Sequence, residues 1–179
     1  VSDLHRERFA RHPWSLQGGG AMELKGHVER RAASRLESQI WIIGRTAHTS
    51  ADEVYFARPG DWRRRHIEQV VELVEGDVVR DWRLHPATSA LFPYDGQLEA
   101  HVEPAAESAL WPHRQFLIRR REPNGTHLEI GLEWFEWSRF HPDRFKAPLS
   151  IAFAFVATHN HFVLDRGGKV FNRSAPVIK

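Results

Sequence analysis

Two histidines in the last quarter of the chain have a spacing that could serve chemistry. His159 and His161 are separated by Asn160, and Asp165 follows His161 by four residues. On a strand, residues two apart point to the same face, so both imidazoles would lie together. Two imidazoles and the Asp165 carboxylate could bind a metal ion, and all three residues of the His-Asn-His segment could instead contact DNA bases. Because the chain has 12 histidines, chance pairs are expected. We therefore favour a structural pair and predict no metal.

Clusters of cationic side chains are a second candidate for function. They are Arg63, Arg64 and Arg65, then Arg119, Arg120 and Arg121, and finally Arg166 and Lys169, which flank Gly167-Gly168. Each triplet is consistent with a solvated surface or with contacts to phosphate. The Gly167-Gly168 pair predicts the turn of a β-hairpin, in which Arg166 and Lys169 would contact DNA phosphate or would only help to form the turn.

The sequence lacks the motifs of a self-contained active site. A methyltransferase needs a glycine-rich cofactor loop after a strand, and an adenine amino-methylase also needs an Asn/Asp-Pro-Pro-aromatic turn. Asn124, Asn160 and Asn172 are the only asparagines, and none precedes a proline. There is no cysteine, which excludes disulfides and thiolate zinc sites. We therefore predict no catalytic residue and no cofactor in this chain.

The elements that would position these residues suggest an α+β fold. Apolar residues at helical spacing predict a helix over 21–38, which follows the glycine triplet 18–20, interpreted as a hinge. The next apolar runs predict a buried strand at 40–43 and a second strand at 54–56, joined as a hairpin. Strand-forming residues dominate further on, so the β-rich part should be mostly antiparallel. Trp41 and Trp111 are expected in the core, and core packing is also favoured for Trp134 and Trp137.

Composition limits the class of protein. The 179 residues are 41% hydrophobic, which is enough for a folded domain, and the formal net charge is only +2. No apolar run approaches the roughly 18 residues that a membrane span needs, so no membrane partner is expected. The absence of cysteine and of a signal peptide fits a cytoplasmic protein. Because the chain begins at Val1 and its one methionine is Met22, we interpret it as part of something longer.

Several phrases resemble one family of large enzymes. "HPWSLQGGGAMELKGHVE", "IGRTAHTSADEVYF" and "PLSIAFAFVATHNHFVLDRGGKVFNRSAPVIK" occur here in that order. They resemble the region that follows the catalytic domain in type IIG-like restriction–modification and phage-exclusion adenine DNA methyltransferases. The resemblance covers essentially the whole chain, and its closing phrase is the most specific part.

The resemblance implies a function for the chain. It implies a connecting segment and helix at 1–38 and a target-recognition domain at 39–179, with double-stranded DNA and the catalytic methyltransferase domain of the same chain as partners. S-adenosylmethionine would be bound by that catalytic domain, with or without an additional endonuclease activity. The expected DNA contacts are Arg63, Arg64, Arg65, Arg119, Arg120, Arg121, His159, Asn160, His161, Arg166 and Lys169. Two alternatives remain, which are a metal-binding or small hydrolytic domain built on His159, His161 and Asp165, and a protein-interaction domain.

Overall fold

The computed structural model describes residues 6–10, 14 and 20–179, and these divide into two compact units, unit 1 (residues 1–39) and unit 2 (residues 40–179). Gly18 and Gly19, two members of the glycine triplet, lie outside the described residues. Within the described ranges, no helix is long and apolar enough to cross a membrane.

Unit 1 contains one α-helix, α1 (Ala21–Arg31), and the 3-10 helices η1 (Arg6–Phe9) and η2 (Leu36–Ser38). The expected helix over 21–38 is therefore wrong in its second half, because Ala32 takes an extended conformation and ends α1. No residue of α1 is buried, and Leu24 and Val28 are 64% and 58% exposed. A helix of this length gains little stability without tertiary packing. The helical spacing of apolar residues is therefore not enough to continue α1 beyond Arg31.

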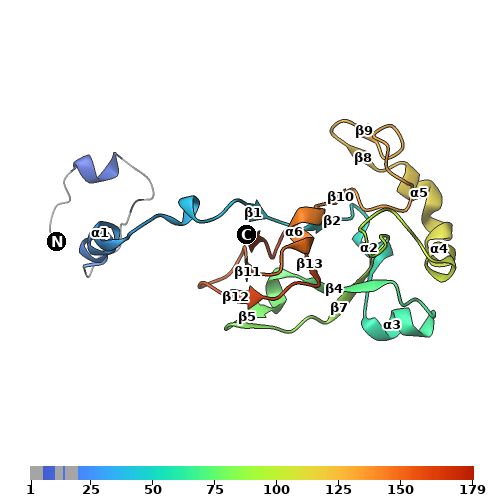
Figure 1. Ribbon diagram of the computed structural model, residues 1–179, viewed down its shortest axis with the longest axis horizontal. Helices are drawn as coiled ribbons and strands as arrows, with labels where there is room; N and C mark the ends of the chain where they lie inside the picture. Colours follow the sequence, from blue (N-terminus) through green and yellow to red (C-terminus); the bar gives the residue numbers. More distant parts are fainter. Residues whose placement is uncertain (1–5, 11–13, 15–19) are drawn as a thin grey trace. The chain divides into compact units, whose positions relative to one another are not determined.

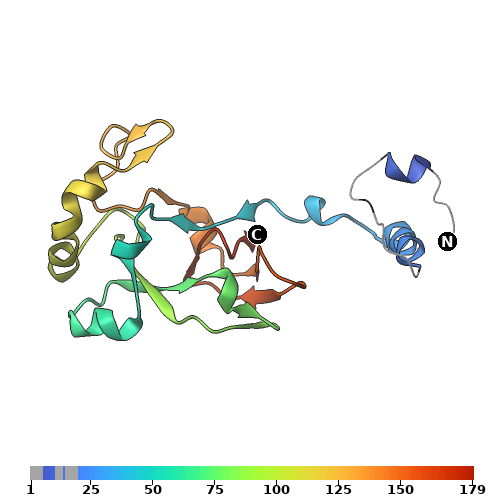
Figure 2. The same ribbon diagram turned by 180° about the vertical axis from the view of Figure 1, so that it is seen from behind.

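Unit 2 is built on two four-stranded sheets, seen from opposite sides in Figure 1 and Figure 2. The first sheet has the order β1 (Ile43–Gly44), β14 (Val177–Ile178), β11 (Ser150–Phe153) and β12 (Phe162–Asp165), and all its pairs are antiparallel. The second has the order β13 (Lys169–Phe171), β4 (Val70–Val74), β7 (Thr88–Leu91) and β3 (Phe56–Ala57). Only β13 and β4 are parallel in it.

Three two-stranded ribbons and several short helices complete unit 2. The ribbons are β2 (Ala47–His48) with β10 (Arg139–Phe140), β5 (Val79–Arg80) with β6 (Arg83–Leu84), and β8 (Arg121–Glu122) with β9 (Gly125–Thr126). The helices are α2 (Asp52–Tyr55), α3 (Pro59–Arg64), η3 (Gly76–Val78), α4 (Pro104–Leu110), η4 (Trp111–His113), α5 (Arg114–Ile118) and α6 (Pro142–Lys146). The predicted α+β class, with an N-terminal helix and mainly antiparallel strands, is confirmed.

Two of the expected strands are wrong. In 40–43 only Ile43 joins a strand, and its partner is β14, so the expected hairpin does not form. The second expected strand is mostly helix α2, because the Thr49 hydroxyl accepts a hydrogen bond from the Ala51 N–H at 3.1 Å and donates one to the Asp52 carboxylate. Such a turn at the start of a helix provides hydrogen bonds for backbone groups that, in a strand, would bond to a neighbouring strand.

The expected hairpin at Gly167-Gly168 is also wrong. β12 pairs with β11, whereas β13 leaves that sheet and pairs with β4 in the other. The glycines therefore connect two sheets, and at φ 89° and 74° both take the left-handed backbone conformation that glycine adopts readily.

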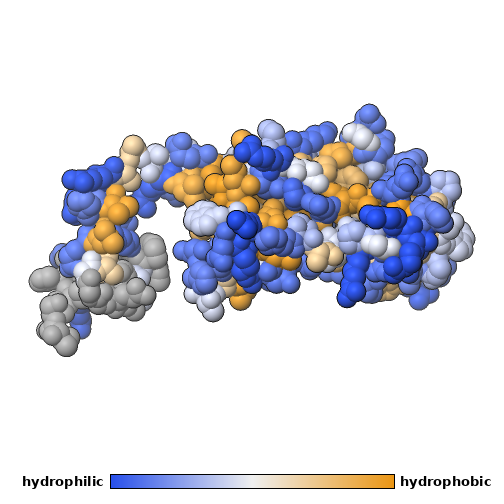
Figure 3. Space-filling view, turned by 90° about the horizontal axis from the view of Figure 1, so that it is seen from below, coloured by the Kyte–Doolittle hydropathy of each residue, from blue (hydrophilic) through white to orange (hydrophobic). Residues whose placement is uncertain are grey.

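Unit 2 contains two clusters of buried hydrophobic residues. The larger contains Tyr55, Trp62, Leu91 and Trp137, and the smaller contains Val79, Val163 and Phe171 among others. Trp134 and Trp137 are buried, as favoured from the sequence, but Trp41 and Trp111 are wrong as core residues because they are 60% and 58% exposed. In the space-filling view, apolar surface lies among hydrophilic side chains over unit 2 (Figure 3).

Candidate nucleic-acid interface

A basic cluster forms around the β2–β10 ribbon from residues far apart in the chain. Thr46, just before β2, donates its N–H to the Phe171 carbonyl at 2.9 Å, and its hydroxyl accepts the Phe171 N–H at 2.6 Å. The Arg144 guanidinium donates to the Arg45 carbonyl at 2.6 Å. These bonds bring the C-terminal segment and α6 to the ribbon. The basic cluster, as defined here, consists of Arg45, His48, Arg139, His141, Arg144 and Arg173.

The charges of the basic cluster repel one another. Burial lowers the pKa of Arg45, and the neighbouring charges of Arg139, Arg173 and Arg144 lower it further. Burial followed by nearby arginines likewise lowers the pKa of His48 and of His141, which favours neutral imidazoles.

One acid partly compensates this charge. Glu122 pairs with Arg139, with a carboxylate oxygen 2.5 Å from the guanidinium. Arginine keeps its charge under all ordinary conditions, so the basic cluster retains a positive surplus that an anion such as phosphate would relieve.

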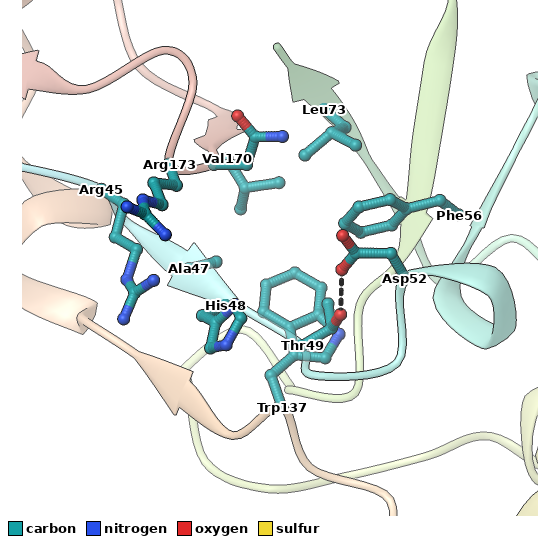
Figure 4. Close-up of a pocket in the computed structure, with 11 residues that line it drawn as sticks. Arg45, Ala47, His48, Thr49, Asp52, Phe56, Leu73, Trp137, Val170 and Arg173 are labelled. Carbon is teal, nitrogen blue, oxygen red and sulfur yellow. Dashed lines mark hydrogen bonds between the residues drawn. The ribbon is translucent and has the colours of Figure 1, made fainter. Parts of the chain in front are cut away.

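A pocket of about 270 Å³ opens beside the basic cluster (Figure 4). Arg45 and Arg173 lie at one side of it, and Thr49 and Asp52 lie at the other, joined by a hydrogen bond. The full lining is Arg45, Ala47, His48, Thr49, Asp52, Phe56, Leu73, Trp137, Val170, Asn172 and Arg173. The pocket thus combines an aromatic and aliphatic wall with cationic and carboxylate groups, which suits a planar polar group next to a negative charge.

The first arginine triplet lies away from the basic cluster. Arg63, Arg64 and Arg65 are exposed on and just after α3. Arg64 pairs with Asp61, and the Arg65 guanidinium lies 5.8 Å from the centre of the Trp62 ring. These are the contacts of a solvated surface, and they leave the three charges accessible.

The second triplet is divided between surface and interior. Arg119 and Arg121 are exposed, whereas Arg120 is only 5% exposed. The Arg120 guanidinium donates to the carbonyls of Thr49, Trp134 and Glu136 at 2.5, 3.2 and 2.7 Å. Arg120 therefore holds three segments of backbone together and is not available to DNA.

The His-Asn-His segment lies in the loop between β11 and β12, not on a strand. His159 and Asn160 are exposed and His161 is buried, with 4.1 Å between the centres of the two imidazole rings. Asp165, the expected third metal ligand, is instead buried and pairs with Lys169 at 3.0 Å. The acid near the histidines is Asp81, whose carboxylate lies 3.4 Å from Nδ1 of His161.

The two cations at the turn after β12, Arg166 and Lys169, have different surroundings. Arg166 is exposed, whereas the Lys169 ammonium is held by Asp165 and by the Gly167 carbonyl, to which it donates at 3.3 Å. The predicted residues therefore lie in three places, at α3, at α5–β8 and around β11–β13, and do not form one patch (Figure 1).

Sequence reasoning missed the basic cluster altogether. Arg45, Arg139, Arg144 and Arg173 stand singly in the chain, so none of them forms a run. Only the pairing of β2 with β10, together with the bonds of Thr46 to Phe171, brings them together. Arg45 and Arg173 do occur within the family-like phrases, which was the one available signal.

Comparison with known proteins supports a link to a methyltransferase. No family model matches the chain. The whole chain is 38% identical, over 186 aligned positions, to the adenine-specific methyltransferase PglX of Streptomyces coelicolor. It spans only 15% of the length of that protein. The chain is therefore similar to one part of an adenine-specific methyltransferase, as the family-like phrases suggested.

Proposed function

We propose that this chain is a DNA-contacting module of an adenine-specific DNA methyltransferase and that it has no active site of its own. The observation that carries the proposal is the basic cluster, in which four arginines converge beside a polar pocket. Whole-molecule charge is close to neutral at +2, so a local concentration of cations is needed to attract DNA. Similarity to an adenine-specific methyltransferase supports DNA as the partner of this charge.

The proposed mechanism separates positioning from reading. Arg45 and Arg173 would contact phosphates and fix the register of the duplex, because guanidinium groups match phosphate geometry. Contacts to base edges would come from side chains around the pocket and from the exposed residues predicted from sequence. The exposed set is Arg63, Arg64, Arg65, Arg119, Arg121, His159, Asn160 and Arg166. The catalytic domain of the longer enzyme would bind S-adenosylmethionine and carry out the methyl transfer. That enzyme would be located in the cytoplasm.

A salt series with paired variants tests the proposal. The chain should bind duplex DNA with a dissociation constant of roughly 1–100 µM, measured by fluorescence anisotropy, and the affinity should fall steeply with salt. In the double variant Arg45→Gln/Arg173→Gln, two phosphate contacts are lost. Its affinity at low salt should fall at least tenfold, and the slope of log K against log salt should decrease by about 2.

The matched control removes the same charge elsewhere. The variant Arg58→Gln/Arg83→Gln changes two exposed arginines, one just before α3 and one in β6, that belong neither to the basic cluster nor to the exposed set. Its DNA affinity should stay within about threefold of the unchanged chain if the basic cluster is the principal contact. Equal losses in both double variants would show only general charge attraction, and no binding at low salt would remove the proposal for this chain. Thermal unfolding of each variant confirms that the fold is intact.

A further inference from the structure

Three side chains from two segments meet at one edge of unit 2. His159 and His161 come from the loop between β11 and β12, and Asp81 comes from the turn between β5 and β6. Each offers one ligand atom, and the three atoms all lie within 4.8 Å of one another. This group is separate from the basic cluster and from the pocket beside it.

One separation between ligand atoms matches that of a small tetrahedral ion. Ligand atoms bonded at 2.0–2.1 Å to a tetrahedral zinc ion are about 3.3 Å apart. Nδ1 of His161 and Oδ1 of Asp81 are 3.4 Å apart, which matches that edge. At present the Asp81 N–H donates to the same nitrogen over a long 3.3 Å, and a metal would replace that weak bond.

The ion pair between His161 and Asp81 does not account for the position of His159. His161 has Asp81 as its polar neighbour. The exposed His159 ring lies 4.1 Å from the His161 ring, centre to centre, and among the described residues it forms no hydrogen bond or ion pair with Asp81. The Thr158 hydroxyl lies 3.1 Å from Nδ1 of His159, so Nε2 is the nitrogen left to bind. A hydrogen bond to one ring nitrogen commonly orients an imidazole that binds a metal through the other.

The backbone at Asp81 is unusual in a way that serves this arrangement. Asp81 and Trp82 have φ of 46° and 68°, and Arg80 pairs with Arg83, so they form a two-residue hairpin turn. Such turns prefer asparagine, aspartate and glycine, and a tryptophan there is strained. The turn directs the Asp81 carboxylate, whose side chain is 82% exposed, toward the buried His161.

We propose that His159, His161 and Asp81 form a binding site for a divalent transition metal ion, with Zn²⁺ as the ion that fits best. Two imidazole nitrogens and one carboxylate oxygen are ligands that zinc accepts, and water would fill the fourth position. The ion would tie the β11–β12 loop to the β5–β6 hairpin. The proposal does not depend on DNA binding.

Metal titration of the untagged 179-residue chain, after treatment with a chelator, tests the site. Isothermal titration with Zn²⁺ should show one strong equivalent per chain. Co²⁺ should give the visible absorption of a tetrahedral complex, and saturating Zn²⁺ should raise the midpoint of thermal unfolding. Asp81→Asn and His159→Gln should each weaken Zn²⁺ binding at least tenfold. Both side chains are exposed, and asparagine tolerates the left-handed turn, so the metal-free variants should fold.

A matched control separates this site from the other histidines. His113→Gln changes an exposed histidine in η4 and should leave Zn²⁺ affinity within twofold. Absence of a stoichiometric equivalent would overturn the proposal, as would unchanged Zn²⁺ affinity in Asp81→Asn and His159→Gln. If Asp81 serves only an ion pair with His161, Asp81→Asn would lower the metal-free unfolding midpoint while Zn²⁺ had no effect on the unchanged chain. That result would also overturn it.

Discussion

At the scale of single residues, three adjacent arginines differ in their exposure to solvent. Arg119 and Arg121 are exposed, whereas Arg120 is buried, with its guanidinium 5.6 Å from the centre of the Tyr55 ring and bonded to several carbonyls. A planar fork of five donors can reach carbonyls spread around it, whereas a lysine ammonium has only three donors on one atom. Arg120 is therefore a structural residue despite its place in a basic run.

This difference predicts a graded response to alanine. Arg120→Ala removes the buried guanidinium bonds to the carbonyls of Thr49, Trp134 and Glu136, so the free energy of unfolding should fall by about 3 kcal/mol. Arg119→Ala and Arg121→Ala should change it by less than about 0.5 kcal/mol. Urea unfolding of the three variants measures this. Similar effects at all three positions would contradict the role assigned to Arg120.

His127 is a buried base whose proton position can be inferred. The Ser138 hydroxyl donates to the Thr49 carbonyl at 3.2 Å, so it must accept from Nε2 of His127, which lies 2.8 Å away. Nδ1 of His127 is buried and has no hydrogen-bond partner among the described residues. A second proton at Nδ1 would therefore be unsatisfied. Burial, and next the charge of Arg120, lower the pKa of His127 to about 4.

A pH-dependent loss of stability follows from His127. Its pKa is near 6.5 in the unfolded chain and about 4 in the folded chain, so the unfolded state takes up the proton first as the pH falls. Stability should therefore drop between pH 6.5 and 4, by up to about 3 kcal/mol from this group, with no further loss from it below pH 4.

The variant His127→Gln isolates this contribution. Glutamine can still donate to Ser138 but does not titrate, so the difference in unfolding free energy between pH 7 and pH 4.5 should become smaller than in the unchanged chain. His48 and His141, whose pKa values burial also lowers, would contribute to the slope that remains. Parallel pH curves for the two proteins would contradict the assignment.

At the scale of elements, a close approach of backbone joins the start of η3 to the turn before β14. The Gly76 N–H donates to the Ser174 hydroxyl at 2.8 Å, and a Cβ at Gly76 would lie 2.4 Å from the Ser174 carbonyl oxygen. Only glycine permits this approach, because the obstructing atom belongs to the backbone.

Gly76→Ala should therefore destabilise unit 2 by roughly 1–3 kcal/mol, since one of the two segments must move. Gly96→Ala is the matched control, because a Cβ there would meet nothing within 4 Å. The control should be neutral or slightly stabilising. Chemical denaturation compares the two, and equal stability would show that the approach of Gly76 to Ser174 adapts without strain.

Local pattern predicted the class of fold but not its connections. The helix after Gly20, the burial of Trp137 and the prevalence of antiparallel strands were all predictable from periodicity and residue type. The helix α2 was not, because its Val-Tyr-Phe composition favours a strand and only the bonds of Thr49 decide otherwise. The basic cluster was not predictable either, since it depends on pairings between segments about a hundred residues apart.

At the scale of the whole molecule, unit 2 contains both buried clusters. Their buried members all lie between Ala47 and Val177, whereas no residue of α1 is buried. We therefore expect a chain of residues 40–179 to fold alone, with an unfolding midpoint within a few degrees of that of the 179-residue chain. Calorimetry of both chains measures this. A loss of cooperative unfolding in the shorter chain would show that unit 1 contributes to the fold.

The strands β13 and β14 have a consequence for biosynthesis. β14 lies between β1 and β11 in one sheet, and β13 closes an edge of the other, so residues 169–178 complete both. Until the ribosome has released them, β1 has no partner and one edge of β4 is open. Pairings that span more than a hundred residues also form slowly. The nascent domain must therefore keep two open strand edges from aggregating until residues 169–178 emerge, which makes it a natural client for chaperones that shield such edges.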